Sequence, residues 1–237
     1  MKTPRLYQNT VFKVGETCAL DRSVAHHLFK VLRAGSAQEI ILFNGDGWNY
    51  QAQVLADKTA EVKILSRVKN TTESKLETTL VQGVAKGEKM DFLIQKAVEL
   101  GVNRIIPMTS SRCVVKLKGE KADKRLAHWR KIIIHACEQS GRSVVPELLD
   151  IHTLDQVLNL NLAHLFVLHH RADQSLSAYP ATEQATLLIG PEGGLSSEEI
   201  DQALDAGAQP LLLGGRILRT ETASLAALAN MQLLWGS

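Results

Sequence analysis

The feature that most restricts the fold of this 237-residue chain is the alternation of short apolar runs with helical patterns from about residue 78 onward. The apolar runs are rich in Leu, Ile and Val, and the segments between them place apolar residues at helical spacing. Strands that alternate with helices pair in parallel, because each helix returns the chain to the starting edge of the sheet. The alternation therefore predicts an α/β fold in which helices cover both faces of a mainly parallel sheet.

The lengths of these runs predict the individual elements. Strands are predicted near residues 78–84, 104–107, 145–149, 164–169, 186–189 and 210–213. Helices are predicted near residues 89–100, 122–140 and 222–234, and further helices connect the later strands.

The first 70 residues show a different pattern. Residues 39–43 and 48–55 are strand-like runs on either side of Asn44-Gly45-Asp46-Gly47, and a further β-rich run starts at Thr59. Asn-Gly and Asp-Gly pairs supply the positive backbone angles of a tight hairpin, so a small β-barrel is predicted. Apolar residues at helical spacing between residues 22 and 33 add a short helix.

A polar stretch without periodicity, residues 68–75, separates the two patterns. We therefore predict two domains, at residues 1–70 and 71–237. Charge is divided in the same way: the first domain has 10 Lys and Arg against 6 Asp and Glu, a net charge of +4, and the second has 17 against 19, a net charge of −2.

A second basic group lies in residues 112–131, which contain only two acidic residues, Glu120 and Asp123. Its members are Arg112, Lys116, Lys118, Lys121, Lys124, Arg125, Arg130 and Lys131. Clustered positive charge is typical of proteins that bind a polyanion. Solvation of an exposed helix face explains this group equally well.

The sequence gives no sign of a membrane span or a metal site. No stretch reaches the roughly 18 consecutive apolar residues of a membrane helix, and no secretory signal is recognisable, so we expect a cytoplasmic protein. Cys18, Cys113 and Cys137 are far apart, and the pair His169-His170 has no evident third ligand. We therefore expect no metal.

The sharpest local motif is the glycine-rich turn at residues 190–194, which directly follows the apolar run Leu187-Leu188-Ile189. Ser196 and Glu199 have the spacing of a capping box and predict the start of the next helix. The turn is thus placed at the carboxyl end of a parallel strand, where α/β sheets bind ligands. Glycines let the backbone approach a ligand closely, although the turn also suits a plain connection between two elements.

A second glycine turn, Gly214-Gly215, follows the apolar run Leu211-Leu212-Leu213 and precedes another helix start. Two such turns on nearby strands predict opposite walls of one pocket. Arg216 and Arg219 are candidates to meet phosphate, and Thr220 or Thr222 is expected to cap the following helix.

These two turns occur together with two further motifs, GEKMDFLIQKAVELG at residues 87–101 and ACEQSGR at residues 136–142. The chain closely resembles the ribosomal small-subunit methyltransferase E family, the 16S ribosomal RNA uridine-N3 methyltransferases of the SPOUT class. The resemblance extends from Pro4-Arg5-Leu6-Tyr7 through residues 27–33 to the last helix, so it covers nearly the whole chain.

The resemblance implies a fold and an activity that the periodicity alone does not show. It implies an N-terminal PUA-like barrel that binds RNA and a C-terminal SPOUT domain whose parallel sheet is tied in a trefoil knot. It also implies S-adenosylmethionine as cofactor, 16S ribosomal RNA or the small ribosomal subunit as substrate, and a homodimer whose subunits share the active sites.

The resemblance also assigns site residues. Cofactor contacts are expected from Leu168, His169, Ile189, Gly190, Pro191, Glu192, Gly193, Gly194, Leu213, Gly214, Gly215, Ile217, Leu218, Thr222 and Ala223. RNA contacts are expected from Arg5, Lys30, Arg33, Lys86, Lys89, Arg112 and Arg142.

Methylation at the uracil N3 requires the loss of one weakly acidic proton, so a base or a stabiliser of negative charge is needed. The candidates are Glu192, Glu221 and Arg219, with either carboxylate for the proton and the guanidinium for the charge. The sequence does not decide between the carboxylates.

Two other functions fit parts of the pattern. A non-enzymatic RNA-binding assembly factor would keep the barrel, but it has no need of intact glycine loops. An α/β enzyme that acts on small phosphorylated metabolites would keep the loops, but it has no use for a basic barrel.

Overall fold

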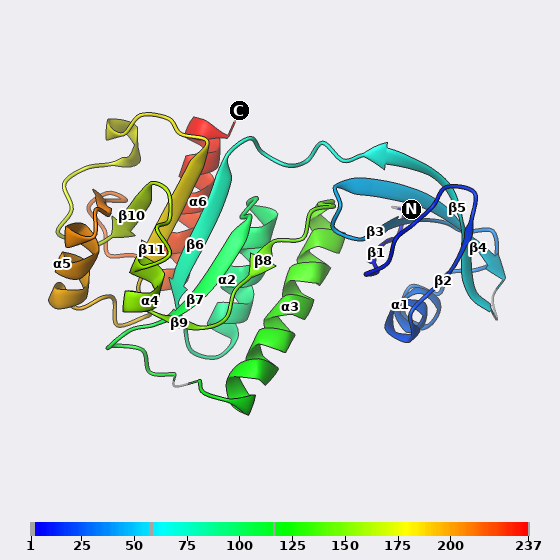
Figure 1. Ribbon diagram of the computed structural model, residues 1–237, viewed down its shortest axis with the longest axis horizontal. Helices are drawn as coiled ribbons and strands as arrows, with labels where there is room; N and C mark the ends of the chain where they lie inside the picture. The colour runs from blue at the N-terminus through cyan, green and yellow to red at the C-terminus, as the bar shows by residue number, and fades with distance from the viewer. Residues whose placement is uncertain (1–2, 57–58, 116, 237) are drawn as a thin grey trace. The chain divides into compact units, whose positions relative to one another are not determined.

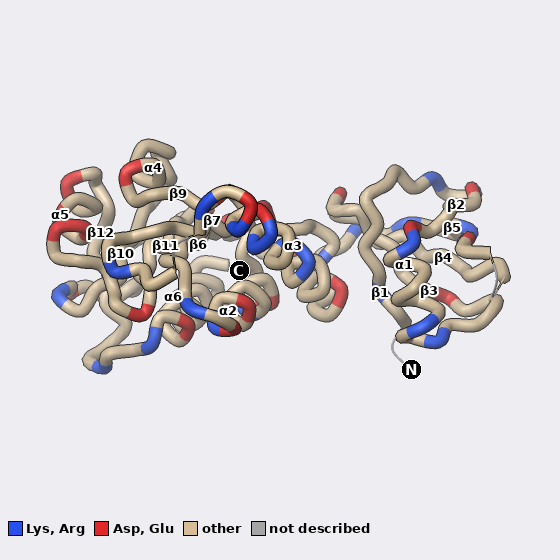
Figure 2. Tube along the Cα trace, turned by 90° about the horizontal axis from the view of Figure 1, so that it is seen from below, with Lys and Arg blue, Asp and Glu red and all other residues tan. Residues whose placement is uncertain are grey.

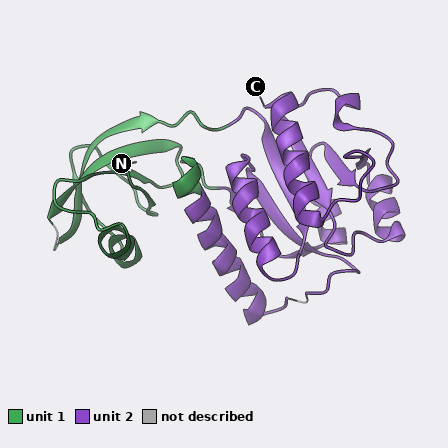
Figure 3. Cartoon of the chain, turned by 180° about the vertical axis from the view of Figure 1, so that it is seen from behind, with its two compact units in different colours: residues 1–73, 137–145 green, residues 74–136, 146–237 purple. Residues whose placement is uncertain are grey.

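The computed structural model describes residues 3–56, 59–115 and 117–236, so Lys116 of the basic group lies outside the described residues. The chain forms two compact units (Figure 3): Met1–Glu73 with Cys137–Val145, and Ser74–Ala136 with Pro146–Ser237. Among the described residues, none of the helices combines the length and apolar character needed to cross a membrane.

The first unit is built on a five-stranded sheet in the order β1-β3-β4-β5-β2. Its strands are β1 (Arg5–Tyr7), β2 (Thr17–Ala19), β3 (Glu39–Phe43), β4 (Trp48–Ala56) and β5 (Thr59–Lys69). The three strands predicted from the sequence are confirmed. Strand β5 continues to Lys69, so the predicted start of the polar linker at residue 68 is wrong. Val68 and Lys69 belong to the strand and pair with Asn49 and Trp48 of β4.

The buried side chain of Gln8 joins the two edge strands of this sheet. Its amide nitrogen donates to the Ala19 carbonyl at the end of β2 at 2.9 Å, and its oxygen accepts from the Asp21 amide at 2.9 Å. The backbone amide of Gln8 donates to Phe43 in β3 at 3.0 Å. One buried side chain thus connects the ends of the two edge strands and satisfies polar groups there.

The predicted short helix is confirmed at residues 22–31, but its second half differs from a regular α-helix. Helix α1 (Arg22–His26) passes into the π-helical turn η1 (His27–Val31). The wider turn changes the direction of the residues that follow. Leu28 is fully buried in the core, whereas Val31 and Leu32, which the periodicity places on the same face, are exposed.

The second unit contains a seven-stranded sheet in the order β12-β10-β11-β6-β7-β8, with β9 beside β7, and all its pairings are parallel. Its strands are β6 (Glu77–Gly83), β7 (Arg104–Thr109), β8 (Glu147–Leu148), β9 (His152–Thr153), β10 (Leu165–Leu168), β11 (Gln184–Ile189) and β12 (Gln209–Leu211). The predicted parallel α/β fold is confirmed.

Helices cover both faces of this sheet (Figure 1). They are α2 (Glu88–Glu99), α3 (Glu120–Ser140), α4 (Leu154–Leu158), the short 3-10 helix η2 (Leu176–Ala178), α5 (Ser197–Asp205) and α6 (Thr220–Trp235). Helices α4 and α5 pack on one face against apolar residues that include Val81, Ile106 and Leu188. Helices α2 and α6 cover the other face (Figure 1).

The topology places the functional segments. Strands β12, β10, β11 and β6 are neighbours and run in parallel, so the segments that follow them meet at one edge of the sheet. Both glycine turns predicted from the sequence lie at this edge, after β11 and β12.

Candidate active site

A cavity of about 320 Å³ opens between the segments that follow β10, β11 and β12. Its lining residues are Arg112, Leu168, His169, His170, Ile189, Gly190, Pro191, Glu192, Gly193, Gly194, Leu195, Ile200, Leu211, Leu212, Leu213, Gly214, Arg216, Ile217, Leu218, Thr220 and Ala223. This volume lies at the lower end of the range for small-molecule sites, roughly 300–1,000 Å³. Most residues assigned to the cofactor are therefore gathered around one cavity, whereas Gly215 and Thr222 are not among its lining residues.

The first glycine loop needs glycine for lack of space. A Cβ atom on Gly190 would lie 2.7 Å from the backbone of Gly194 and Leu195, and one on Gly193 would lie 3.1 Å from the Cβ of Arg112. Gly194 has a φ of +69°, which favours glycine. The predicted capping box is confirmed, with Ser196 as the N-cap of α5.

The second loop leads into helix α6 without a side-chain cap. The N-cap of α6 is Arg219, so the predicted capping by Thr220 or Thr222 is wrong. The hydroxyl of Thr220 instead donates to the Gly190 carbonyl at 2.6 Å, and this bond links the second loop to the first. Gly214 has a φ of +81°, and Ile217 is 94% exposed.

His169 brings an unpaired imidazole to the cavity wall. Both its ring nitrogens are buried, and neither has a hydrogen-bond partner among the described residues. Burial lowers the pKa of His169, and the neighbouring charges of Arg171 and His170 lower it further. The ring is therefore neutral at pH 7, with one nitrogen able to donate and the other able to accept a hydrogen bond.

Glu192 is held by the segment that follows β6. Its carboxylate accepts from the Lys86 amide at 2.9 Å and lies 3.5 Å from the Lys89 ammonium. Burial raises the pKa of Glu192, but the amides of Lys86 and of Glu192 itself, together with Lys89, bring it below the ordinary value. The carboxylate is thus ionised at neutral pH.

The other two catalytic candidates lie beside the cavity. Arg219 is exposed, and Glu221 is half-buried in the first turn of α6. Neither is among the lining residues. The Oε2 atom of Glu221 is buried without a hydrogen-bond partner among the described residues, so it is free to accept a hydrogen bond.

Arg112 has a role at the site that charge alone does not indicate. Its guanidinium donates to the carbonyls of Gly193 and Leu195, at 3.2 Å each, and so holds the first glycine loop in place.

Other members of the basic group are paired with acidic residues: Lys124 pairs with Glu120 at 2.8 Å, and Arg125 lies 4.0 Å from Asp91. Figure 2 shows basic and acidic residues interspersed along this segment.

The basic residues assigned to RNA in the first unit divide into two sets. Lys30 and Arg33 are exposed. Arg142 is 3% exposed and binds the Glu73 carboxylate with two nitrogens, at 3.0 and 2.6 Å. Arg5 is partly buried and donates to Asn49 at 2.9 Å and to Ser143 at 3.1 Å.

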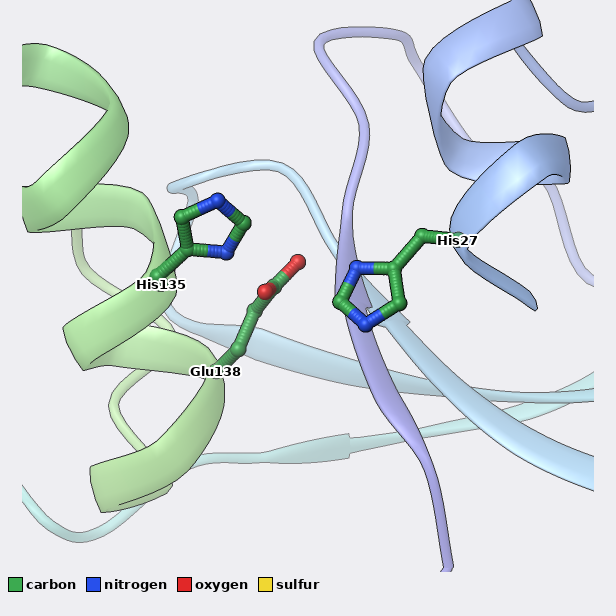
Figure 4. Close-up of side chains that lie close together, drawn as sticks. All are labelled: His27, His135 and Glu138. Carbon is green, nitrogen blue, oxygen red and sulfur yellow. The ribbon is translucent and has the colours of Figure 1, made fainter. Parts of the chain in front are cut away.

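A group of possible metal ligands includes His27, His135 and Glu138. His27 of η1 and Glu138 of α3 belong to the first unit, with ligand atoms within 4.8 Å of each other (Figure 4). The Glu138 carboxylate also accepts from the Tyr7 amide at 3.0 Å. His135 lies one turn earlier on α3, but the division between the units falls between it and Glu138, so we assign no metal to this group.

Comparisons with known proteins agree with this architecture. A family model described as an RNA methyltransferase domain matches residues 72–232, and one described as an RNA methyltransferase PUA domain matches residues 20–65. The ribosomal RNA small subunit methyltransferase E of a Buchnera aphidicola strain is 34% identical over 99% of this chain and 98% of its own.

Two solved structures match nearly the whole chain. The ribosomal RNA small subunit methyltransferase E of Neisseria gonorrhoeae, bound to S-adenosylmethionine, is 40% identical with a TM-score of 0.92 and covers 99% of this chain and 98% of its own. A Legionella pneumophila protein described as a methyltransferase, also with bound S-adenosylmethionine, is 38% identical with a TM-score of 0.95 and covers 100% of both chains.

The parallel sheet, the glycine loops at its carboxyl edge and the PUA domain together define an RNA methyltransferase. The chain belongs to the ribosomal RNA small subunit methyltransferase E family. The resemblance identified from the sequence and the fold class that it implies are confirmed. The trefoil knot is an inference from membership in this family.

Replacement of Gly193 by valine tests the first loop as a cofactor wall. The new side chain meets Arg112, so Gly193→Val is expected to weaken S-adenosylmethionine binding by about tenfold or more, or about 1.4 kcal/mol. Calorimetry measures the affinity and a thermal melt checks the fold. Gly35→Val, at a glycine with open space around it, is the matched control; wild-type affinity in Gly193→Val contradicts the assignment.

The lowered pKa of His169 predicts a dependence of stability on pH. Because protonation is disfavoured in the folded state, the stability contributed by the neutral ring is fully present above pH 6.5 and is lost as the pH falls toward the lowered pKa. The melting temperature of wild type should therefore fall more between pH 8 and pH 5.5 than that of His169→Gln. His26→Gln, at an exposed histidine of α1 in the first unit, is the control; equal losses in wild type and His169→Gln would exclude this role.

Proposed function

We propose that this chain transfers a methyl group from S-adenosylmethionine to the N3 atom of a uridine in 16S ribosomal RNA. The observation that carries the proposal is the cavity between the two glycine loops, in a chain that belongs to this family. An intact first loop, with no space for a Cβ atom at Gly190 and little at Gly193, favours an enzyme over an assembly factor with a vestigial pocket.

The cavity fits a cofactor with a flat apolar part and polar groups. Apolar side chains such as Leu168, Ile189 and Leu218 offer contact area, and the unpaired nitrogens of His169 offer hydrogen bonds. The cofactor supplies a methyl group on a positively charged sulfur. The other residues assigned to it are Glu192, Leu213, Ile217, Thr222 and Ala223, together with the glycines of both loops and Pro191.

The protein must then align the uracil and accept its N3 proton. Glu192 is bound by Lys86 and Lys89 and has a lowered pKa, so it is a weak base. Glu221 has a buried, unpartnered oxygen, so this oxygen is free to accept a hydrogen bond from the uracil N3–H, and we favour Glu221 for this position. Arg219, the N-cap of α6, is our candidate for stabilising negative charge on the uracil carbonyls.

RNA is held by the positive charge of the first unit. Lys30 and Arg33 are exposed and are our first candidates for phosphate contacts. Lys86, Lys89 and Arg112 lie beside the cavity loops and are candidates for the nucleotides next to the target. Arg5 and Arg142 complete the assigned set, although their guanidinium groups are engaged within the unit.

The protein is proposed to act as a cytoplasmic homodimer without a metal. Exposed apolar residues support a further contact surface: Leu233 at the end of α6 is 77% exposed and Ile217 in the second loop is 94% exposed. The two residues lie near opposite ends of α6, and each offers apolar area for a partner subunit to bury.

The reaction can be tested directly on 16S ribosomal RNA. Wild-type protein with S-adenosylmethionine should produce N3-methyluridine, detected by mass spectrometry of nuclease digests. Arg219→Ala should lower the rate at saturating RNA by about a hundredfold or more and affect RNA affinity less, as expected for a group that acts in the transition state. The absence of N3-methyluridine with wild type contradicts the reaction, and an unchanged rate in Arg219→Ala contradicts the role of Arg219.

Binding of RNA by the first unit predicts a change in salt dependence. The double variant Lys30→Ala with Arg33→Ala should weaken RNA binding and lower the slope of log affinity against log salt by about 0.7–0.9 for each phosphate that the variant no longer neutralises. S-adenosylmethionine affinity should be unchanged. Filter binding between about 50 and 200 mM salt measures the slope, and an unchanged slope would exclude both residues from phosphate binding.

A further inference from the structure

The side chain of Gln82 is the most completely enclosed amide near the cavity. It lies at the carboxyl end of β6 and is 0% exposed, in a strand whose neighbouring residues Leu80 and Val81 are apolar core. Side chains alternate along a strand, so Gln82 projects to the face opposite Val81, toward α6. A buried amide costs stability unless it is hydrogen-bonded, so its partners define its role.

Each polar atom of Gln82 has a partner from another element. Its Nε2 donates to the hydroxyl of Thr220 at 2.9 Å, and it lies 3.0 Å from the Gly83 carbonyl and 3.4 Å from the Gly190 carbonyl. Its Oε1 accepts from the hydroxyl of Ser224 in α6 at 2.6 Å. Thr220 donates its own proton to the Gly190 carbonyl at 2.6 Å, so the donors and acceptors are matched around the network.

The network joins the two walls of the cavity. Gly190 begins the first glycine loop, and Thr220 ends the second at the start of α6; both line the cavity. Gln82 is not a lining residue, yet it contacts both. Ser224, one turn further along α6 and fully buried, fixes the orientation of the Gln82 amide.

We propose that Gln82 is a positioning residue that sets the spacing of the two cofactor loops through Thr220 and Gly190. The proposal rests on the assignment of this cavity to S-adenosylmethionine. A side chain that only fills the core would be replaced by any residue of similar volume without a specific effect on the cofactor. A positioning residue acts through its hydrogen bonds, and its removal lowers cofactor affinity in the folded protein.

The test compares variants that keep the shape and remove the hydrogen bonds. Gln82→Met keeps a long unbranched side chain, and Thr220→Val keeps the branched shape of threonine without its hydroxyl. Each is expected to weaken S-adenosylmethionine binding by about tenfold, with a similar rise in the KM for the cofactor and a smaller change in kcat. Thr220→Ser retains the hydroxyl and should restore affinity to within about threefold of wild type. Gln202→Met, at an exposed glutamine of α5, is the matched control.

Calorimetry on the full chain gives the affinities, and thermal melts without cofactor give the folded fraction. If Gln82→Met fails to fold, the comparison of Thr220→Val with Thr220→Ser tests the proposal by itself. The double variant Gln82→Met with Thr220→Val should bind S-adenosylmethionine more tightly than the product of the two single effects predicts, because both changes break the same hydrogen-bond network. Wild-type affinity in folded Gln82→Met and Thr220→Val, or equal losses in Thr220→Val and Thr220→Ser, would overturn the proposal. Failure of the wild-type protein to bind the cofactor would instead overturn the proposed function.

Discussion

The backbone at the end of β6 approaches the first glycine loop so closely that no side chain fits between them. A Cβ atom on Gly83 would lie 2.3 Å from the backbone nitrogen of Pro191. The contact is possible because β6 and β11 pair in parallel, with Gln82 opposite Ile189, so their ends are level. The loop after β11 therefore turns directly over the end of β6, and the position of one wall of the cavity follows from the pairing of two central strands.

Charge in the first unit is used for its internal structure as well as for its surface. Arg142 is buried, and a buried guanidinium requires an ionised partner, which Glu73 provides with two hydrogen bonds. This ion pair joins the two segments of the first unit, Met1–Glu73 and Cys137–Val145, which are far apart in the sequence. Positive charge counted along the chain thus overstates the charge available to RNA.

The sequence was sufficient where a pattern is local. Periodicity located the central strands and the long helices, and the capping box at Ser196 located the start of α5. It did not find the short edge strands β1 and β2, because three residues are too few for a pattern. Nor did it single out Gln82, Gly83 or the clamp by Arg112, since each depends on a neighbour more than 80 residues away. The only sign of Gln82 in the sequence is its position as a polar residue directly after the apolar residues Leu80 and Val81 of a predicted strand.

The uncharged character of the network behind the cavity suits the chemistry. Methyl transfer by direct displacement depends mainly on alignment, which a rigid wall supplies. Gln82, Thr220 and Ser224 are neutral and fully paired, so they fix the loops without adding charge to the cavity wall. A buried ion pair in their place would carry a large desolvation cost and a strong local field. The charged groups Glu192, Arg219 and Glu221, which the proposed function assigns to the reacting base, lie instead in the glycine loops or at the start of α6.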